Sequence, residues 1–107
     1  MDEIIDRQVA AYNSLDLDAF VSCYAEDVVV EDGRGNVLMK GHKGLRDAYG
    51  PFFRDNPELR AGVTHRIQIG SFVVDEERVT GLESDPVCAV VIYHVADDLI
   101  DHVRILR

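Results

Sequence analysis

The sequence predicts an α+β fold, in which three N-terminal helices pack on the concave side of a curved, mostly antiparallel sheet of about six strands. Two observations lead to this prediction. Apolar residues recur at helical spacing in the first third of the chain, and four runs of β-forming residues occupy its second half. At 107 residues the chain has the length of one domain, which we expect to span residues 1–107.

Two helices are expected before the first strand. Asp2 can cap a helix that keeps Ile5, Val9 and Tyr12 on one face and ends at residues 13–14. Asp16 can cap a second helix, whose apolar residues follow the spacing i, i+3, i+4, i+7: Leu17, Phe20, Val21 and Tyr24. These two segments should cover one face of the sheet.

A hairpin and a third helix should follow. Residues 28–32 alternate with a period of two, residues 33–36 (GRGN) have the composition of a tight turn, and residues 37–40 return as the partner strand. A third helix is expected over residues 42–53, with either a kink or an early stop at Gly50-Pro51. The remaining strands are expected over residues 59–69, 71–82, 87–95 and 99–106.

The last hairpin permits a prediction of side-chain direction. If Asp97-Asp98 is a two-residue turn, Val95 opposes Ile100 and the remaining pairs follow in register. One face then carries Val90, Ile92, His94, Asp101, Val103 and Ile105. The other face carries Val91, Tyr93, Val95, Ile100, His102 and Arg104. His94 and Asp101 would form a hydrogen-bonded pair, either as part of a site or as a salt bridge at the rim of the sheet.

Composition and charge exclude several classes of function. Eleven Lys and Arg against twenty Asp and Glu give a net charge of −9, which disfavours nucleic acid and anionic membranes as partners. We find no apolar run of the ~18 residues that a membrane helix needs and no secretory signal, so we expect a cytoplasmic protein. The two cysteines and four histidines lack metal-binding spacing, and no nucleotide-binding motif occurs. We therefore expect neither a metal nor an organic cofactor.

Asp32 is the candidate reactive group. It ends a valine-rich strand on the same face as Val28 and Val30, where an apolar wall would raise the pKa of its carboxyl towards values useful in acid–base chemistry. The alternative is that Asp32 only opens the turn at residues 33–36, as aspartate often does.

Two stretches, YAEDVVVED at residues 24–32 and GHKGLRDAY at residues 41–49, resemble the ketosteroid isomerase and SnoaL-like branch of the nuclear transport factor 2-like superfamily. The resemblance implies that Asp32 is the carboxylate base and that Tyr24 and Tyr49 support an oxyanion. It places Gln8 where the family's isomerases have a tyrosine that donates to the oxyanion. It also places Val90, which cannot donate, at the position of the partner carboxylic acid.

The function expected on this basis is an isomerase- or cyclase-like enzyme in which Asp32 shuttles a proton on a small apolar, cyclic or carbonyl-bearing ligand and Gln8 polarises an oxygen. The expected ligand contacts are Tyr12, Tyr24, Tyr49, Phe52, Val90, His94 and Asp101. For the tyrosines, the alternative is a role as core aromatics with satisfied hydroxyls. The alternative for the whole chain is a non-catalytic ligand-binding or dimerisation module on the same fold.

A homodimer is also expected. We expect the outer face of the sheet to carry Val91, Tyr93, Val95 and Ile100, and such a face is too apolar to remain in water.

Overall fold

Three helices and six strands make up the computed structural model, which describes residues 2–84 and 86–107. Their order along the chain is α1 (Asp2–Asn13), α2 (Leu17–Ser22), β1 (Tyr24–Asp32), β2 (Val37–Lys40), α3 (Gly41–Asp55), β3 (Arg60–Ile69), β4 (Phe72–Thr80), β5 (Val87–Ala96) and β6 (Leu99–Leu106). Within the described part of the chain, no helix is both long and apolar enough to cross a membrane.

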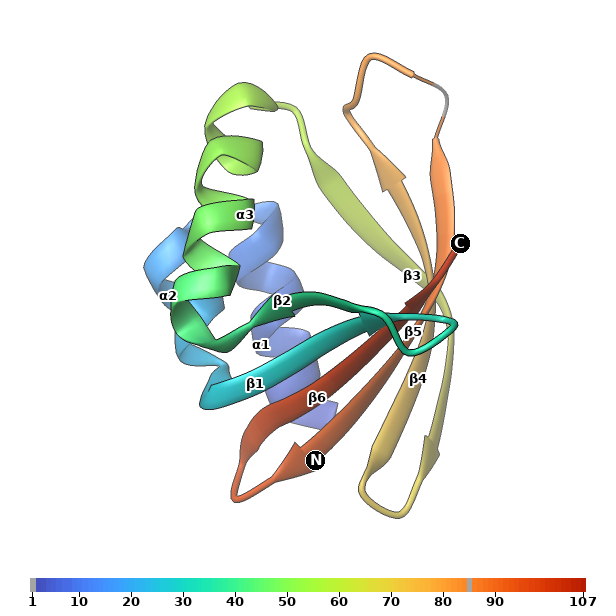
Figure 1. Cartoon of the computed structure of the whole chain (residues 1–107). Helices are drawn as coiled ribbons and strands as arrows, with labels where there is room; N and C mark the ends of the chain where they lie inside the picture. The colour runs from blue at the N-terminus through green and yellow to red at the C-terminus, as the bar shows by residue number, and fades with distance from the viewer. Residues whose placement is uncertain (1, 85) are drawn as a thin grey trace.

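The strands form one mixed sheet in the order β2-β1-β6-β5-β4-β3. All neighbouring strands are antiparallel except β1 and β6, which run parallel. All three helices lie on one side of this twisted sheet (Figure 1). The predicted α+β class, with three helices against a six-stranded sheet, is confirmed.

The helices begin and end close to the predicted residues, with two exceptions. Asp16 caps α2 as predicted, because its Oδ1 accepts a hydrogen bond from the Ala19 backbone N–H at 3.1 Å. Tyr24 belongs to β1, where it pairs with Ile100, and not to the preceding helix. Of the two alternatives expected at Gly50-Pro51, a kink or an early stop, the early stop is wrong, since α3 continues to Asp55.

The continuation of α3 past Pro51 has a physical reason. A proline inside a helix removes one backbone hydrogen bond and crowds the preceding turn. Leu45 and Phe53, on either side of the proline, are buried against the rest of the molecule at 1% and 5% exposure. We attribute the survival of the helix to this burial, which offsets the lost hydrogen bond.

The turn of the last hairpin is confirmed. The predicted faces hold for Val91, Tyr93, Val95 and Ile100, which share one face, but not for the part of β6 beyond Asp101. Asp97 and Asp98 have φ angles of 53° and 61°, as a tight two-residue turn requires. A β-bulge then inserts Asp101 as an extra residue, so that Val95 opposes Ile100 whereas His94 opposes His102. The residues expected on the outer face are in fact buried in the core: Val91, Tyr93, Val95 and Ile100.

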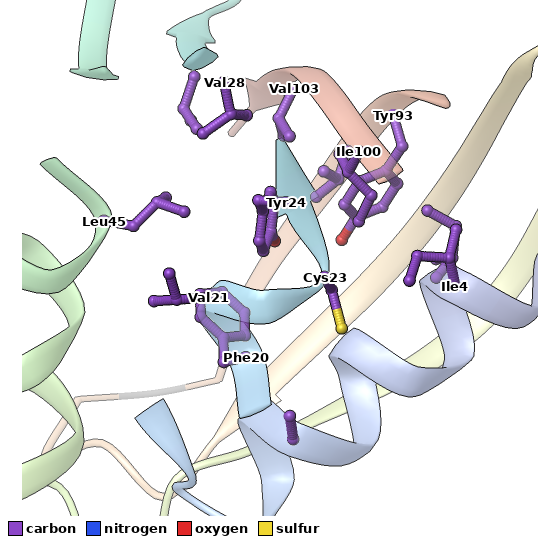
Figure 2. Packing of buried hydrophobic residues seen from close by; sticks show 14 of the residues in the cluster. Ile4, Phe20, Val21, Cys23, Tyr24, Val28, Leu45, Tyr93, Ile100 and Val103 are labelled. Atoms are coloured by element: carbon purple, nitrogen blue, oxygen red, sulfur yellow. The ribbon is translucent and has the colours of Figure 1, made fainter. Parts of the chain in front are cut away.

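The core lies between the helices and the inner face of the sheet. Figure 2 shows Phe20, Tyr24 and Leu45 meeting there from α2, β1 and α3. The ring of Phe20 is the centre of an aromatic group, with its centroid 5.1 Å from that of Tyr24 and 4.8 Å from that of Tyr49. These rings form part of the wall of a cavity that lies under the helices.

Candidate functional site

A cavity of about 70 Å³ lies between the helices and the inner face of the sheet. Ligand pockets for drug-sized molecules usually measure roughly 300–1,000 Å³, so this cavity has room for a cluster of waters or a small organic molecule. Its walls are mainly valines and aromatic rings. The polar residues in the lining are Gln8, Tyr12, Tyr24, Tyr49, Glu77, Tyr93 and Arg107.

A chain of hydrogen bonds crosses the buried side of the cavity. The Tyr24 hydroxyl donates to Gln8 Oε1 at 2.9 Å, and Gln8 Nε2 donates to the Tyr93 hydroxyl oxygen at 3.0 Å. The Tyr93 hydroxyl in turn donates to Glu77 Oε2 at 2.9 Å. Three strands and α1 supply these side chains, so the fold itself holds them in place.

Glu77 is the carboxyl group of this cavity. Its side chain projects from the inner face of β4, and the residue is only 9% exposed. Burial raises the pKa of Glu77 above its ordinary value, and the nearby charge of Asp75 adds to this effect. The hydrogen bond from Tyr93 and the positive charge of Arg66 act in the opposite direction on the pKa. A carboxyl group with a raised pKa is a stronger base than an exposed one, which suits it to accept and return a proton.

A second carboxyl group lies two residues away on the same face and is neutralised by a cation. Asp75 is fully buried, and Arg66 donates to both of its oxygens, at 2.7 and 2.9 Å. Arg66 also bonds to Asp6, which ties α1 to β3. The hydrogen bond to Asp75 is the main cause that raises the pKa of Arg66. The two carboxyl groups therefore differ in surroundings, since Asp75 is held in a bidentate ion pair and Glu77 is not.

The tyrosines of the cavity remain neutral donors. Burial raises the pKa of Tyr49 to about 12 and raises the pKa of Tyr12 further. Burial also raises the pKa values of Tyr24 and Tyr93 well above their ordinary range. Each phenol can therefore offer an O–H to an acceptor at physiological pH.

Asp32 lies outside this cavity. It shares a strand face with Val28 and Val30, as predicted, but at the strand end its Oδ1 accepts hydrogen bonds from the backbone N–H groups of Arg34 and Asn36, both at 2.9 Å. The Asn36 side chain donates to Oδ2, also at 2.9 Å.

The prediction that apolar surroundings raise the pKa of Asp32 is wrong. The Asn36 side chain, with the backbone N–H groups of the turn, lowers it instead. These contacts correspond to the alternative considered from the sequence, in which Asp32 opens the turn.

The other predicted site residues divide into two groups. Gln8, Tyr12, Tyr24 and Tyr49 line the cavity. Phe52 packs against the core without lining the cavity, and Val90 projects from the opposite face of the sheet. His94 and Asp101 form the predicted pair, with 2.6 Å between Nδ1 and Oδ1, but they too lie on the outer face.

Glu77, Tyr93 and Arg107 are polar lining residues that the sequence did not point to. The signal for Glu77 is weak: Asp75 and Glu77 alternate with Val73 and Val79 on one strand face, but the other face of β4 also carries charges. No local pattern indicates that Arg107 turns towards the cavity. Among residues 2–84 and 86–107, no group of three His, Cys, Asp or Glu side chains could hold a metal ion.

Known structures share this fold over nearly the whole chain. An uncharacterised cystatin-fold protein from Novosphingobium aromaticivorans is 28% identical, with a TM-score of 0.91, and the match covers 98% of this chain and 96% of that one. A "putative polyketide cyclase" from Sinorhizobium meliloti is 21% identical, with a TM-score of 0.84 and coverage of 98% and 94%. A "putative ketosteroid isomerase" from Kribbella flavida is 21% identical, with a TM-score of 0.78 and coverage of 97% and 74%.

The sequence itself also matches a family model. The match to the SnoaL-like domain covers residues 5–103, which includes every helix and strand in part or whole. The matched segment thus contains most of the residues that line the cavity described above. The chain belongs to the SnoaL-like domain family.

Proposed function

We propose that this protein binds a small cyclic or carbonyl-bearing compound in the cavity and that Glu77 transfers a proton on it, as in isomerase- or cyclase-type reactions. The observation that carries the proposal is the position of Glu77. Its carboxyl group is buried in the cavity wall, its pKa is raised, and one of its oxygens is fixed by Tyr93. The structural likeness to proteins named for a polyketide cyclase and a ketosteroid isomerase supports the same class of chemistry.

The proposed step uses the two oxygens of Glu77 differently. Oε2 accepts the hydrogen bond from Tyr93, whereas Oε1 accepts none from the residues that the structure describes. Oε1 would take a proton from a carbon next to the ligand carbonyl, so that the C–H bond breaks and its electron pair moves towards the carbonyl oxygen. Glu77 would then return the proton to the ligand.

Gln8 is the proposed donor to the ligand oxygen. Its Nε2 spends one N–H on Tyr93, and the second N–H can face the developing negative charge. The hydrogen bond from Tyr24 to Gln8 Oε1 fixes the orientation of the amide. Gln8 thus keeps the role expected from the sequence, while the proton transfer moves from Asp32 to Glu77.

Exchange of ligand hydrogens for deuterium tests the proposal. Small cyclic ketones are incubated with the protein in D₂O, and deuterium incorporation next to the carbonyl is followed by NMR. We expect Glu77→Gln to lower the catalysed rate by about 10²–10⁴-fold, the usual contribution of a general base. Glu76→Gln, one residue away on the outer face, and Asp32→Asn serve as matched controls and should retain the rate.

Two outcomes contradict the proposal. One is a wild-type protein that exchanges no ketone of the panel faster than buffer does. The other is a loss of exchange in Asp32→Asn with full activity in Glu77→Gln.

A second candidate function is a dimerisation module. The observation in its favour is a set of apolar side chains exposed on the outer face of the sheet: Ile67, Ile69, Phe72 and Leu106. A homodimer formed through this face is compatible with the proposed chemistry, because the cavity opens on the other side of the sheet.

A further inference from the structure

One guanidinium group lines the cavity among the described residues, and it belongs to Arg107. This residue follows β6 directly and is exposed to solvent. Its charge acts on both Tyr12 and Tyr49, where it partly counteracts the rise in pKa that burial causes. Arg107 therefore lies at the solvent side of the cavity that Tyr12 and Tyr49 also line.

Tyr12 and Tyr49 line the same cavity as Arg107. Their ring centroids lie 6.3 Å apart, with the rings edge to face, and both residues are only partly buried. In the part of the chain that the structure describes, neither hydroxyl is engaged in a hydrogen bond with another protein group, in contrast to those of Tyr24 and Tyr93. Two O–H donors and a guanidinium thus line one cavity, and none of them is hydrogen-bonded to a described protein group, although the wall also holds the carboxyl group of Glu77.

We propose that the ligand of this cavity carries a carboxylate, which Arg107 binds together with the hydroxyls of Tyr12 and Tyr49. A carboxylate accepts several hydrogen bonds in one plane and matches the fork of a guanidinium group. A single cation with two neutral phenols balances one negative charge. A phosphate dianion would add charge that the cavity, with Glu77 in its wall, does not compensate.

This proposal rests on the proposed function, which gives the cavity and the end of the ligand that reacts. Together the two proposals describe the ligand more closely. The carboxylate would lie at Arg107, and the carbonyl or ring would point inwards to Glu77 and Gln8. The size of the cavity, about 70 Å³, restricts the ligand to a small organic acid. A ligand as large as a steroid does not fit the space that the structure shows.

Binding of benzoate and of benzamide tests the proposal, because these probes have nearly the same shape and differ in charge. Their dissociation constants are measured by NMR titration of the ¹⁵N-labelled protein, with shifts expected at residues that line the cavity. We expect benzoate to bind more tightly than benzamide and Arg107→Gln to weaken benzoate by about tenfold or more, as loss of a charged hydrogen-bonded pair does. The binding of benzamide should hardly change.

Three further variants complete the test. Arg78→Gln removes another exposed arginine, on the outer face, and should leave the binding of both probes unchanged. Tyr12→Phe and Tyr49→Phe should each weaken benzoate severalfold, because each removes one hydroxyl and keeps the ring. Equal affinities of the wild type for the two probes, or benzoate binding that survives Arg107→Gln, would overturn the proposal.

The outcomes separate this proposal from the proposed function. If benzoate binds more tightly than benzamide and no ketone of the panel exchanges deuterium, the proposed carboxylate site is supported and the proposed proton transfer by Glu77 is contradicted. If neutral ketones exchange and benzoate shows no preference, the carboxylate site fails and the proton transfer stands. Glu77→Gln distinguishes the two roles as well, since it should abolish exchange yet bind benzoate at least as tightly as the wild type does.

Discussion

The carboxyl group of Glu77 loses its hydration on folding and keeps one hydrogen bond from the protein, that of the Tyr93 hydroxyl. Burial dominates, so the pKa of Glu77 rises relative to that of the unfolded chain. The folded protein therefore binds the proton of Glu77 more tightly than the unfolded protein does. The proposed reactivity of Glu77 and the stability of the fold are thus linked, because the surroundings that raise its pKa also disfavour its charged form.

We predict that Glu77→Gln gains stability relative to the wild type as the pH rises. Below the pKa of unfolded Glu77 the group is protonated in both states and makes no difference to the pH dependence. As the pH rises towards the folded pKa, the wild type loses stability, by about 1.4 kcal/mol for each unit by which the pKa is raised. Urea unfolding of both proteins between about pH 4 and about pH 8 measures the difference.

Glu76 is the matched control for this prediction and should behave in the opposite way. The Thr64 hydroxyl, and then His65, lower the pKa of Glu76, which is exposed on the outer face of β4. Glu76→Gln should therefore lose stability relative to the wild type as the pH rises, and the loss should disappear when the pH falls through the folded pKa. A Glu77→Gln variant with the same trend as Glu76→Gln would contradict the account of Glu77.

At the level of helices and strands, the sequence pattern predicts most of the fold because local signals agree with tertiary packing. The capping aspartate of α2, the change to period two in β1 and the turn at Asp97-Asp98 are each set by neighbours in the chain. Pro51 shows the limit of such signals. Its effect on α3 depends on how firmly Leu45 and Phe53 are buried, and that follows from the rest of the molecule.

The candidate site is predicted less completely than the fold. Its residues come from different strands, and the pairing register between those strands decides which side chains meet. The resemblance to the family indicates Gln8, Tyr24 and Tyr49, which do line the cavity. A single bulge at Asp101 reverses the faces of one strand relative to its partner, and a period-two pattern cannot reveal it. The bulge places Val103 on the face opposite to the predicted one. Tyr93 shares a face with Val95 and Ile100 as predicted, but that face is the inner one, and the period-two pattern does not tell which face packs on the helices.

At Gly81 both the backbone conformation and a close contact require a glycine. It follows β4 with a φ of +85°, and a Cβ at this position would overlap the backbone carbonyl of Glu58, just before β3. We predict that Gly81→Ala destabilises the protein by about 3 kcal/mol or more, since both the left-handed conformation and the backbone contact oppose a side chain.

Gly70 provides the comparison for Gly81. It also has a positive φ, +56°, but a Cβ there would meet no atom within 4 Å. Gly70→Ala should therefore cost only about 1 kcal/mol, the cost of the backbone conformation alone. Urea unfolding of the two variants measures both effects. Equal losses of stability would show that the contact between residue 81 and the Glu58 carbonyl does not affect the free energy of unfolding.

At the scale of the whole molecule, the two faces of the sheet have different surroundings. The inner face packs on the helices and holds the cavity, while the outer face carries apolar side chains among ion pairs such as that of Glu31 with His102 and Arg104. Ile67, Ile69 and Phe72 are 57%, 70% and 45% exposed and lie next to one another across β3 and β4. Water-exposed faces of antiparallel sheets are usually polar, so such a patch is typical of a surface that another chain covers.

We predict that the protein forms a homodimer through this outer face. Two copies that face each other across a twofold axis would bury the patch on both at once, against the repulsion of a net charge of −9 on each chain. Sedimentation at micromolar concentration should show a dimer for the wild type and a monomer for Ile69→Glu. Gln68→Glu adds the same charge on the inner side of the same strand and should remain a dimer. A wild type that sediments as a monomer contradicts the prediction, whereas a dimer that both variants preserve places the interface elsewhere on the molecule.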